Sequence, residues 1–90
     1  MKLWSRAATV DLTAIILHIA KDNFVAALKR KDEILQRSRV LIEQPKIGKL
    51  GRVETTHEFV LSDLDTVLIY RLIDGKPQVL RCLHTRQRWP

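Results

Sequence analysis

The sequence predicts an α+β domain: a short N-terminal strand, a helical hairpin, and then a three-stranded antiparallel sheet packed on the helices. Two observations carry this prediction. Apolar residues recur at helical spacing in the first half of the chain, and the second half holds two β-rich runs joined by Asp74-Gly75. A chain of 90 residues can bury a single core without disulfides, so we expect residues 1–90 to form one domain.

The first half begins with Leu3-Trp4-Ser5, which we expect to be the short strand. The helix that follows is amphipathic over about four turns. Either Ser5 or Thr9 has a side chain that could cap it. Its apolar stripe is predicted to consist of Ala8, Leu12, Ile15, Ile16 and Ile19.

The second helix begins after a break at Asp22-Asn23, where either residue could cap it. It should end at Pro45, because the proline ring and the missing N–H prevent a helix from continuing. So short a connection between two helices gives a helical hairpin. The second stripe is predicted to contain Phe24, Ala27, Leu28, Ile34, Leu35, Leu41 and Ile42.

The sheet belongs to the second half of the chain. We predict a loop over residues 45–51, a strand over 52–61, and a hairpin whose Asp74-Gly75 turn is typical of type I′. In a two-residue loop Ile73 pairs with Lys76, which sets the register of the hairpin. One face then carries Val67, Ile69, Arg71, Ile73, Leu80, Cys82 and His84. The other carries Leu68, Tyr70, Leu72, Val79, Arg81 and Leu83.

Both predicted faces are apolar, whereas an antiparallel sheet usually has one face in water. Two helices can cover only one of them, so we expect another chain to cover the far face. The alternative is a partly exposed face that Tyr70 and long side chains shield.

The net charge and the cysteine count limit the partners and the cellular compartment that we expect. Sixteen basic and ten acidic residues give a net charge of +6, which serves solubility or attracts an anionic partner such as nucleic acid or an acidic protein segment. The single cysteine, Cys82, cannot form an internal disulfide and favours a reducing compartment. The first seven residues lack a hydrophobic signal region, and the apolar run at 13–20 is too short to span a bilayer. We therefore expect a cytoplasmic protein with no membrane association.

Candidate functional residues gather at the C-terminal end. They are Arg81, His84, Arg86, Arg88 and Trp89, with Arg71 joining them in the predicted register. A metal-free ribonuclease could use Arg81 to stabilise a charged phosphorane and His84 or Glu58 to move the proton. The alternative is a solvated basic rim, and Trp89 either folds back onto the core or belongs to an interaction surface. The sequence holds no metal-ligand cluster, phosphate-binding loop or nucleophile elbow, so we expect no metal, cofactor or small-molecule substrate.

Several short motifs run in order through nearly the whole chain. They are Ala8-x-x-Asp11-Leu12-x-x-Ile15, Ile19-Ala20-x-Asp22-Asn23-x-x-Ala26-Ala27, Pro45-x-x-Gly48-x-x-Gly51-Arg52-Val53, Tyr70-Arg71, Leu80-Arg81-x-Leu83-His84 and Trp89-Pro90. With these motifs the chain resembles the RelE/ParE toxin superfamily, and most closely its ParE branch. The resemblance implies the toxin half of a bacterial type II toxin–antitoxin pair. It also implies a cognate antitoxin, ParD-like or of another type II class, whose C-terminal part wraps the toxin. We expect that antitoxin to contact Leu68, Tyr70, Leu72, Val79 and Leu83.

Departures from the superfamily bear on the activity. The ribonuclease members tend to carry an arginine where this chain has Val67, and a tyrosine beyond the last strand, where this chain has ended. A surface arginine typical of the ParE branch is His57 here.

Three hypotheses remain. The first is a toxin that binds and poisons DNA gyrase without a catalytic centre of its own, through Arg71, Arg81, His84, Arg86, Arg88 and Trp89. The second is a ribosome-dependent endoribonuclease of the RelE type that uses Glu58, Arg81 and His84, with lysines near 46–49 positioning the message. The third is an antitoxin-binding module whose toxicity is weak or lost.

Overall fold

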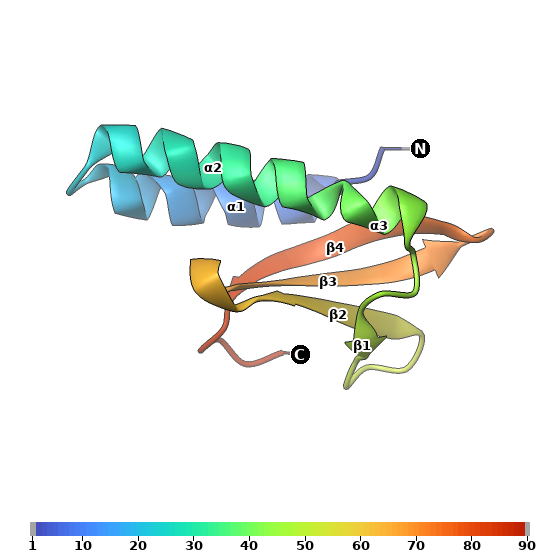
Figure 1. Cartoon of the computed structure of the whole chain (residues 1–90). Coiled ribbons are helices and arrows are strands. Elements are labelled where there is room, and N and C mark those ends of the chain that lie inside the picture. The colour runs from blue at the N-terminus through green and yellow to red at the C-terminus, as the bar shows by residue number, and fades with distance from the viewer. Residues whose placement is uncertain (1, 90) are drawn as a thin grey trace.

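The computed structural model describes residues 2–89 and has two layers, with the helices on one face of the sheet (Figure 1). The predicted α+β class and the order of helices before sheet are confirmed. The helices are α1 (Arg6–Ala20), α2 (Phe24–Ser38) and α3 (Val40–Glu43). The strands are β1 (Lys49–Leu50), β2 (Thr56–Leu61), β3 (Thr66–Ile73) and β4 (Lys76–His84), with a 3₁₀ turn at Ser62–Leu64. Among the described residues, no helix is both long enough and apolar enough to cross a membrane.

Each long helix starts at a capping side chain. Ser5 Oγ accepts a hydrogen bond from the Ala8 N–H at 3.1 Å, and Asn23 Oδ1 accepts one from the Ala26 N–H at 2.9 Å. The single long helix expected up to Pro45 is instead divided at Arg39 into α2 and α3.

The expected N-terminal strand is reduced to one bridge. Trp4 pairs with Val79 in parallel, and the Val79 N–H donates to the Leu3 carbonyl at 2.6 Å. The Trp4 indole N–H donates to Ser38 Oγ at 3.0 Å. The N-terminal segment therefore fixes the start of α1 between β4 and the end of α2.

The sheet is antiparallel throughout, in the order β1-β2-β3-β4. β1 comes from the segment predicted to be a loop. β2 begins at Thr56 rather than at residue 52, because residues 51–55 turn back so that the Gly51 N–H donates to the Thr56 carbonyl at 2.9 Å. The Asp74-Gly75 turn has φ of +52° and +78°, as a type I′ turn requires, and Ile73 pairs with Lys76 as predicted.

A β-bulge changes the hairpin register beyond Tyr70. Tyr70 pairs with Val79 but Ile69 pairs with Arg81, so Leu80 is the extra residue on β4. Because side chains alternate along a strand, this one residue reverses the face of everything that follows. The predicted faces are therefore wrong from residue 81 onward. Cys82 and His84 lie on the side of Leu68 and Tyr70, and Arg81 and Leu83 lie on the side of Val67, Ile69 and Arg71.

The core lies between the helices and one face of the sheet, which we call the helix-facing side. Leu68, Tyr70, Val79 and Cys82 belong to it and are at most 1% exposed. The helices contribute Ala8, Leu12, Ile16, Ala27, Ile34 and Leu41. The Tyr70 hydroxyl donates to the Pro45 carbonyl at 2.8 Å and accepts from the Gly48 N–H at 2.9 Å, which fastens the loop before β1 to the sheet.

The opposite face, the tail-facing side, is partly closed by the protein's own C-terminus. Residues 85–89, the tail, turn beneath the sheet on the side away from the helices (Figure 1). The Arg81 guanidinium carbon lies 5.7 Å from the centre of a Trp89 ring, so Trp89 folds back against the sheet. Ile69 and Leu83 on this side are only 1% and 4% exposed, although they lie outside the main core cluster. The tail therefore covers part of the face that we expected another chain to cover.

Candidate functional site

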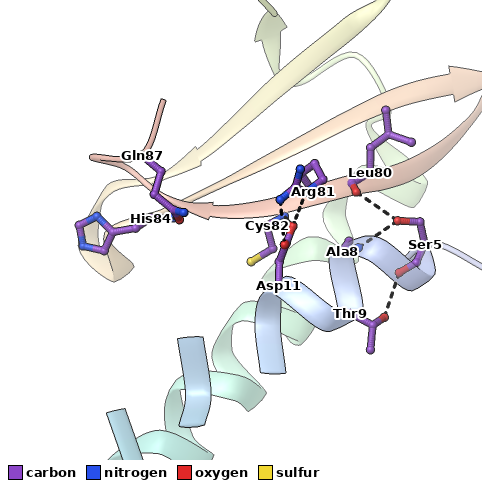
Figure 2. A network of polar contacts seen from close by, with 9 residues as sticks. All are labelled: Ser5, Ala8, Thr9, Asp11, Leu80, Arg81, Cys82, His84 and Gln87. Atoms are coloured by element: carbon purple, nitrogen blue, oxygen red, sulfur yellow. Dashed lines mark hydrogen bonds and ion pairs between the residues drawn. The ribbon is translucent and has the colours of Figure 1, made fainter. Parts of the chain in front are cut away.

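Asp11 of α1 and Arg81 of β4 form a two-pronged ion pair (Figure 2). Arg81 Nε donates to Asp11 Oδ2 at 2.6 Å, and Arg81 Nη2 donates to Oδ1 at 3.0 Å. The backbone N–H of Cys82 donates to the same Oδ2 at 3.0 Å. The hydrogen bonds to Asp11 raise the pKa of Arg81 above its ordinary value. The charge of this arginine is therefore neutralised by a neighbour.

Trp89 lies against the guanidinium of Arg81 in a cation–π contact. The tail residues before Trp89 are exposed, including Arg86 and Arg88, whereas Trp89 itself is half-buried. Of the predicted C-terminal cluster, the structure thus brings Arg81 and Trp89 into contact, and it leaves Arg86 and Arg88 exposed in the tail.

His84 occupies the turn between β4 and the tail. Its Nδ1 accepts from the Arg86 N–H at 3.1 Å, and its own N–H donates to Gln87 Oε1 at 2.7 Å. His84 also lines a cleft of about 500 Å³ between α1 and the end of the sheet, to which His18 contributes as well. His84 therefore points to the helix side of the turn, while Arg81 belongs to the tail-facing side.

The three residues of the ribonuclease hypothesis do not converge. Glu58 and Arg81 lie on the tail-facing side, but both pair with Ile69 of the intervening strand, so their backbones are about two strand spacings, or ~10 Å, apart. Glu58 accepts from the Arg52 N–H at 3.3 Å and lies 3.9 Å from Lys49 Nζ. His84 is on the other side of the sheet. The predicted acid–base pair is not assembled at a common point.

Arg71 is exposed and shares the tail-facing side with Arg81, two residues beyond Ile69 along β3. A hairpin register without a bulge predicts Arg71 on the face of His84 and Arg81 on the opposite face. The bulge at Leu80 reverses both assignments.

The residues expected to contact the antitoxin require a correction. Leu68, Tyr70 and Val79 are 0% exposed because α1 and α2 pack on them, and Leu72 packs against the same core. Leu83 lies on the opposite side of the sheet and is buried. These five positions do not form one open surface that a partner could reach.

An open apolar surface lies instead on the outside of the helical hairpin, and it includes two residues that the helical spacing predicts for the buried stripe. Phe24 is 65% and Leu28 45% exposed, and Val10 and Leu17 of α1 are exposed as well. Between the helices runs a groove of about 280 Å³. It is lined by Trp4, Thr9, Leu12, Thr13, Ile16, Leu17, Lys31 and Leu35. A neighbouring hollow adds Lys2 and Arg39. The groove therefore has an apolar floor and a cationic rim.

Within residues 2–89, no group of three or more His, Cys, Asp or Glu side chains is placed to hold a metal ion. Burial raises the pKa of the Cys82 thiol to about 12, so it is neutral and unreactive at physiological pH.

Comparison with known proteins agrees with the resemblance seen in the motifs. The chain matches the family described as "ParE toxin of type II toxin-antitoxin system, parDE" over residues 3–89. It is 33% identical over 87 residues to a Sinorhizobium fredii protein named "Putative toxin Y4kP", covering 97% of this chain and 90% of that one. A solved structure described as "Chromosomal ParDE TA system from P. aeruginosa" has a TM-score of 0.80 to this chain. At 24% identity over 90% of both chains, that likeness shows the fold. The protein belongs to the ParE toxin family of type II toxin–antitoxin systems.

Proposed function

We propose that this toxin inhibits growth by binding and poisoning DNA gyrase, and that a cognate antitoxin neutralises it. The observation that carries the proposal is the pairing of Arg81 with Asp11. It occupies the arginine that a phosphate-cleaving site would need, and Glu58 and His84 are held elsewhere. What the tail offers is a binding surface rather than an acid–base pair.

The surface we assign to the target consists of the tail and the exposed arginine on the tail-facing side. Arg71, Arg86 and Arg88 supply exposed positive charge, and Trp89 supplies an aromatic ring that packs on Arg81. Aromatic and arginine side chains are enriched among residues that dominate binding energy at protein interfaces. Cations at the rim also speed encounter with an acidic surface or with DNA held by an enzyme.

The test is a supercoiling assay with purified gyrase and the purified toxin. We expect inhibition and trapped cleaved DNA from the native chain, and a loss of about tenfold or more from Arg86→Glu with Arg88→Glu. Lys21→Glu with Lys29→Glu is the matched control, because both lysines are exposed on the helical hairpin and the charge change is equal. Growth arrest with unaffected gyrase and with transcripts cut during translation would replace the proposal with the ribonuclease. Normal growth despite folded toxin would favour a module without toxicity.

For the antitoxin we propose the groove on the outside of the helical hairpin. The P. aeruginosa structure is of a ParDE toxin–antitoxin system, which supports a partner of the same kind here. An apolar floor with Lys2, Lys31 and Arg39 around it suits an amphipathic segment with acidic flanks. The large exposed apolar side chains nearby would then be covered.

Co-expression with the antitoxin encoded by the adjacent reading frame tests this surface. Leu17→Arg with Leu28→Arg should leave the toxin active but prevent rescue by the antitoxin, because both positions are exposed on the hairpin. Leu50→Arg is the control, since Leu50 is 82% exposed but lies on β1, away from the helices. Full rescue of the double variant would show that the antitoxin binds elsewhere.

A further inference from the structure

We propose that the ion pair between Asp11 and Arg81 is a clamp that positions the C-terminal tail for target binding. Arg81 then acts as a positioning residue, not as a contact or a catalytic group. The part of this inference that concerns target binding rests on the proposed function, whereas the coupling between the clamp and the tail does not.

The clamp fixes the plane of the guanidinium. Two of its nitrogens donate to the two oxygens of Asp11, and the Cys82 N–H holds one of those oxygens from the backbone of β4 (Figure 2). A guanidinium with two nitrogens bonded to the same carboxylate cannot rotate, whereas a lysine ammonium on its flexible side chain can. The face of the guanidinium is thereby presented to Trp89 at 5.7 Å.

The tail has its own hydrogen bonds only as far as its turn, among the residues that the structure describes. The Thr85 N–H donates to the Asp65 carbonyl, the Arg86 N–H to His84 Nδ1 and the Gln87 N–H to the His84 carbonyl, at 2.9, 3.1 and 2.9 Å. These bonds turn the chain back under the sheet. Beyond residue 87, Trp89 is the described tail residue that is half-buried, and its ring lies against Arg81, whereas residues 85–88 are exposed.

Asp11 is connected to the tail on the other side of the sheet through Arg81. It stands on α1, in the helix layer, while Trp89 lies on the opposite side of the sheet, and Arg81 at the edge strand touches both. The bulge at Leu80 makes the contact geometrically available, because it places Arg81 on the tail-facing side while the Cys82 N–H reaches Asp11. The structure thus links a helix residue to the placement of a residue 78 positions later in the sequence.

Fluorine NMR of the toxin labelled with 5-fluorotryptophan tests the coupling directly. The chain has two tryptophans, so Trp89 reports the tail and Trp4, bonded to Ser38 on the helix side, reports the fold. In Arg81→Lys and in Asp11→Asn we expect the Trp89 signal to move toward the solvent-exposed position while the Trp4 signal stays. Arg37→Lys is the matched control, because Arg37 also donates to a carboxylate at 2.6 Å, that of Asp63, whereas the guanidinium that lies over the Trp89 ring is that of Arg81.

A Trp89 signal that stays in place in a folded Arg81→Lys variant overturns the proposal. If either clamp variant also loses the Trp4 signal, its fold has changed. The contact is then tested from the other side, by observing Arg81 in a variant of Trp89. Trp89→Leu changes a residue outside the core cluster, so the fold is retained. In the native chain the Arg81 Nε–H resonance should carry a ring-current shift that Trp89→Leu removes. An unchanged resonance would refute the contact.

Gyrase inhibition by the same variants tests whether the placement of the tail matters for target binding. Arg81→Lys keeps the positive charge, yet we expect it to lose about tenfold in inhibition, while Arg37→Lys retains full inhibition. Native-level inhibition by Arg81→Lys together with a displaced Trp89 signal would show that the tail's placement does not matter for the target. If the native toxin does not inhibit gyrase at all, the proposed target fails, and the NMR result still decides whether the clamp positions the tail.

Discussion

The two faces of the β3–β4 hairpin are both apolar, yet they are closed by different means. The helix-facing side is sealed by two helices, and Leu68, Tyr70 and Val79 are fully buried there. The tail-facing side is covered in part by residues 85–89, and the last described residue, Trp89, lies against Arg81. The first face determines whether the domain folds. The second keeps Val60 and Arg71 exposed and carries the surface that we assign to the target.

This difference predicts a separation between stability and activity. Changes on the helix-facing side should unfold the toxin, whereas changes on the tail-facing side should leave it folded and weaken its action. Each of the following measurements compares one side with the other, or one ion pair with another.

The largest effect is expected from Leu68→Ala. Its side chain is 0% exposed in the core, and truncating such a leucine leaves a cavity that costs about 2–5 kcal/mol of unfolding free energy. Val60→Ala on the tail-facing side is the control and should cost under ~1 kcal/mol, because Val60 is 40% exposed. Urea denaturation measures both. Equal losses would mean that the two sides contribute alike to stability.

Alkaline pH should weaken the helix-facing side through Cys82. Its pKa is raised from 9.0 to about 12 by burial, with the Asp11 charge adding to the effect. The unfolded chain therefore ionises first, so the stabilisation present below pH 9.0 is lost progressively as the pH approaches 12. The slope is about 1.4 kcal/mol per pH unit in that window.

Comparison with Cys82→Ala isolates the contribution of the Cys82 thiol, because all other side chains are the same in both proteins. The native chain should lose about 1–2 kcal/mol more than the variant between pH 8 and roughly pH 10. Parallel stability curves for the two proteins would show that the thiol is accessible to water in the folded state.

A smaller change in stability is expected from Trp89→Ala. The residue is half-buried, lies outside the core cluster and contacts Arg81 by a cation–π interaction worth about 0.5–1 kcal/mol. The unfolding free energy should fall by about that amount, while growth inhibition on induction is strongly reduced. A variant that loses several kcal/mol would place Trp89 among the residues that hold the fold together.

The sequence was sufficient for the elements that local spacing determines. The helical period located α1 and α2, and Asp74-Gly75 fixed the turn and the first pairs of the hairpin. The sequence left two candidates for each N-cap, and the structure shows that Ser5 and Asn23 are the capping residues. The break at Arg39 was missed because no glycine or proline marks it, and β1 because two residues are too few to show a pattern.

The candidate site depended on a feature without a local signal. Residues 78–84 are all compatible with a regular strand, so nothing there indicated the bulge at Leu80. Missing it moved Arg81 and His84 to the wrong sides of the sheet. The partner of Arg81 was equally hidden, because Asp11 lies 70 positions away along the chain. A bidentate pair between such distant residues follows from packing α1 beside β4, which the sequence pattern alone does not determine.

The smallest effect should come from the second ion pair, between Arg37 and Asp63. Its N–O distance is 2.6 Å, the same as between Arg81 and Asp11, but both side chains are exposed, at 41% and 63%, compared with 39% and 16% in the clamp. The hydrogen bond lowers the pKa of Asp63 and raises that of Arg37, yet water competes for both groups and salt screens them. Arg37→Ala should therefore leave the thermal midpoint almost unchanged, and the remaining difference should vanish in 1 M salt, where the screening length is about 3 Å. A marked loss of stability that persists in high salt would mean that distance, not exposure, decides what these two pairs contribute.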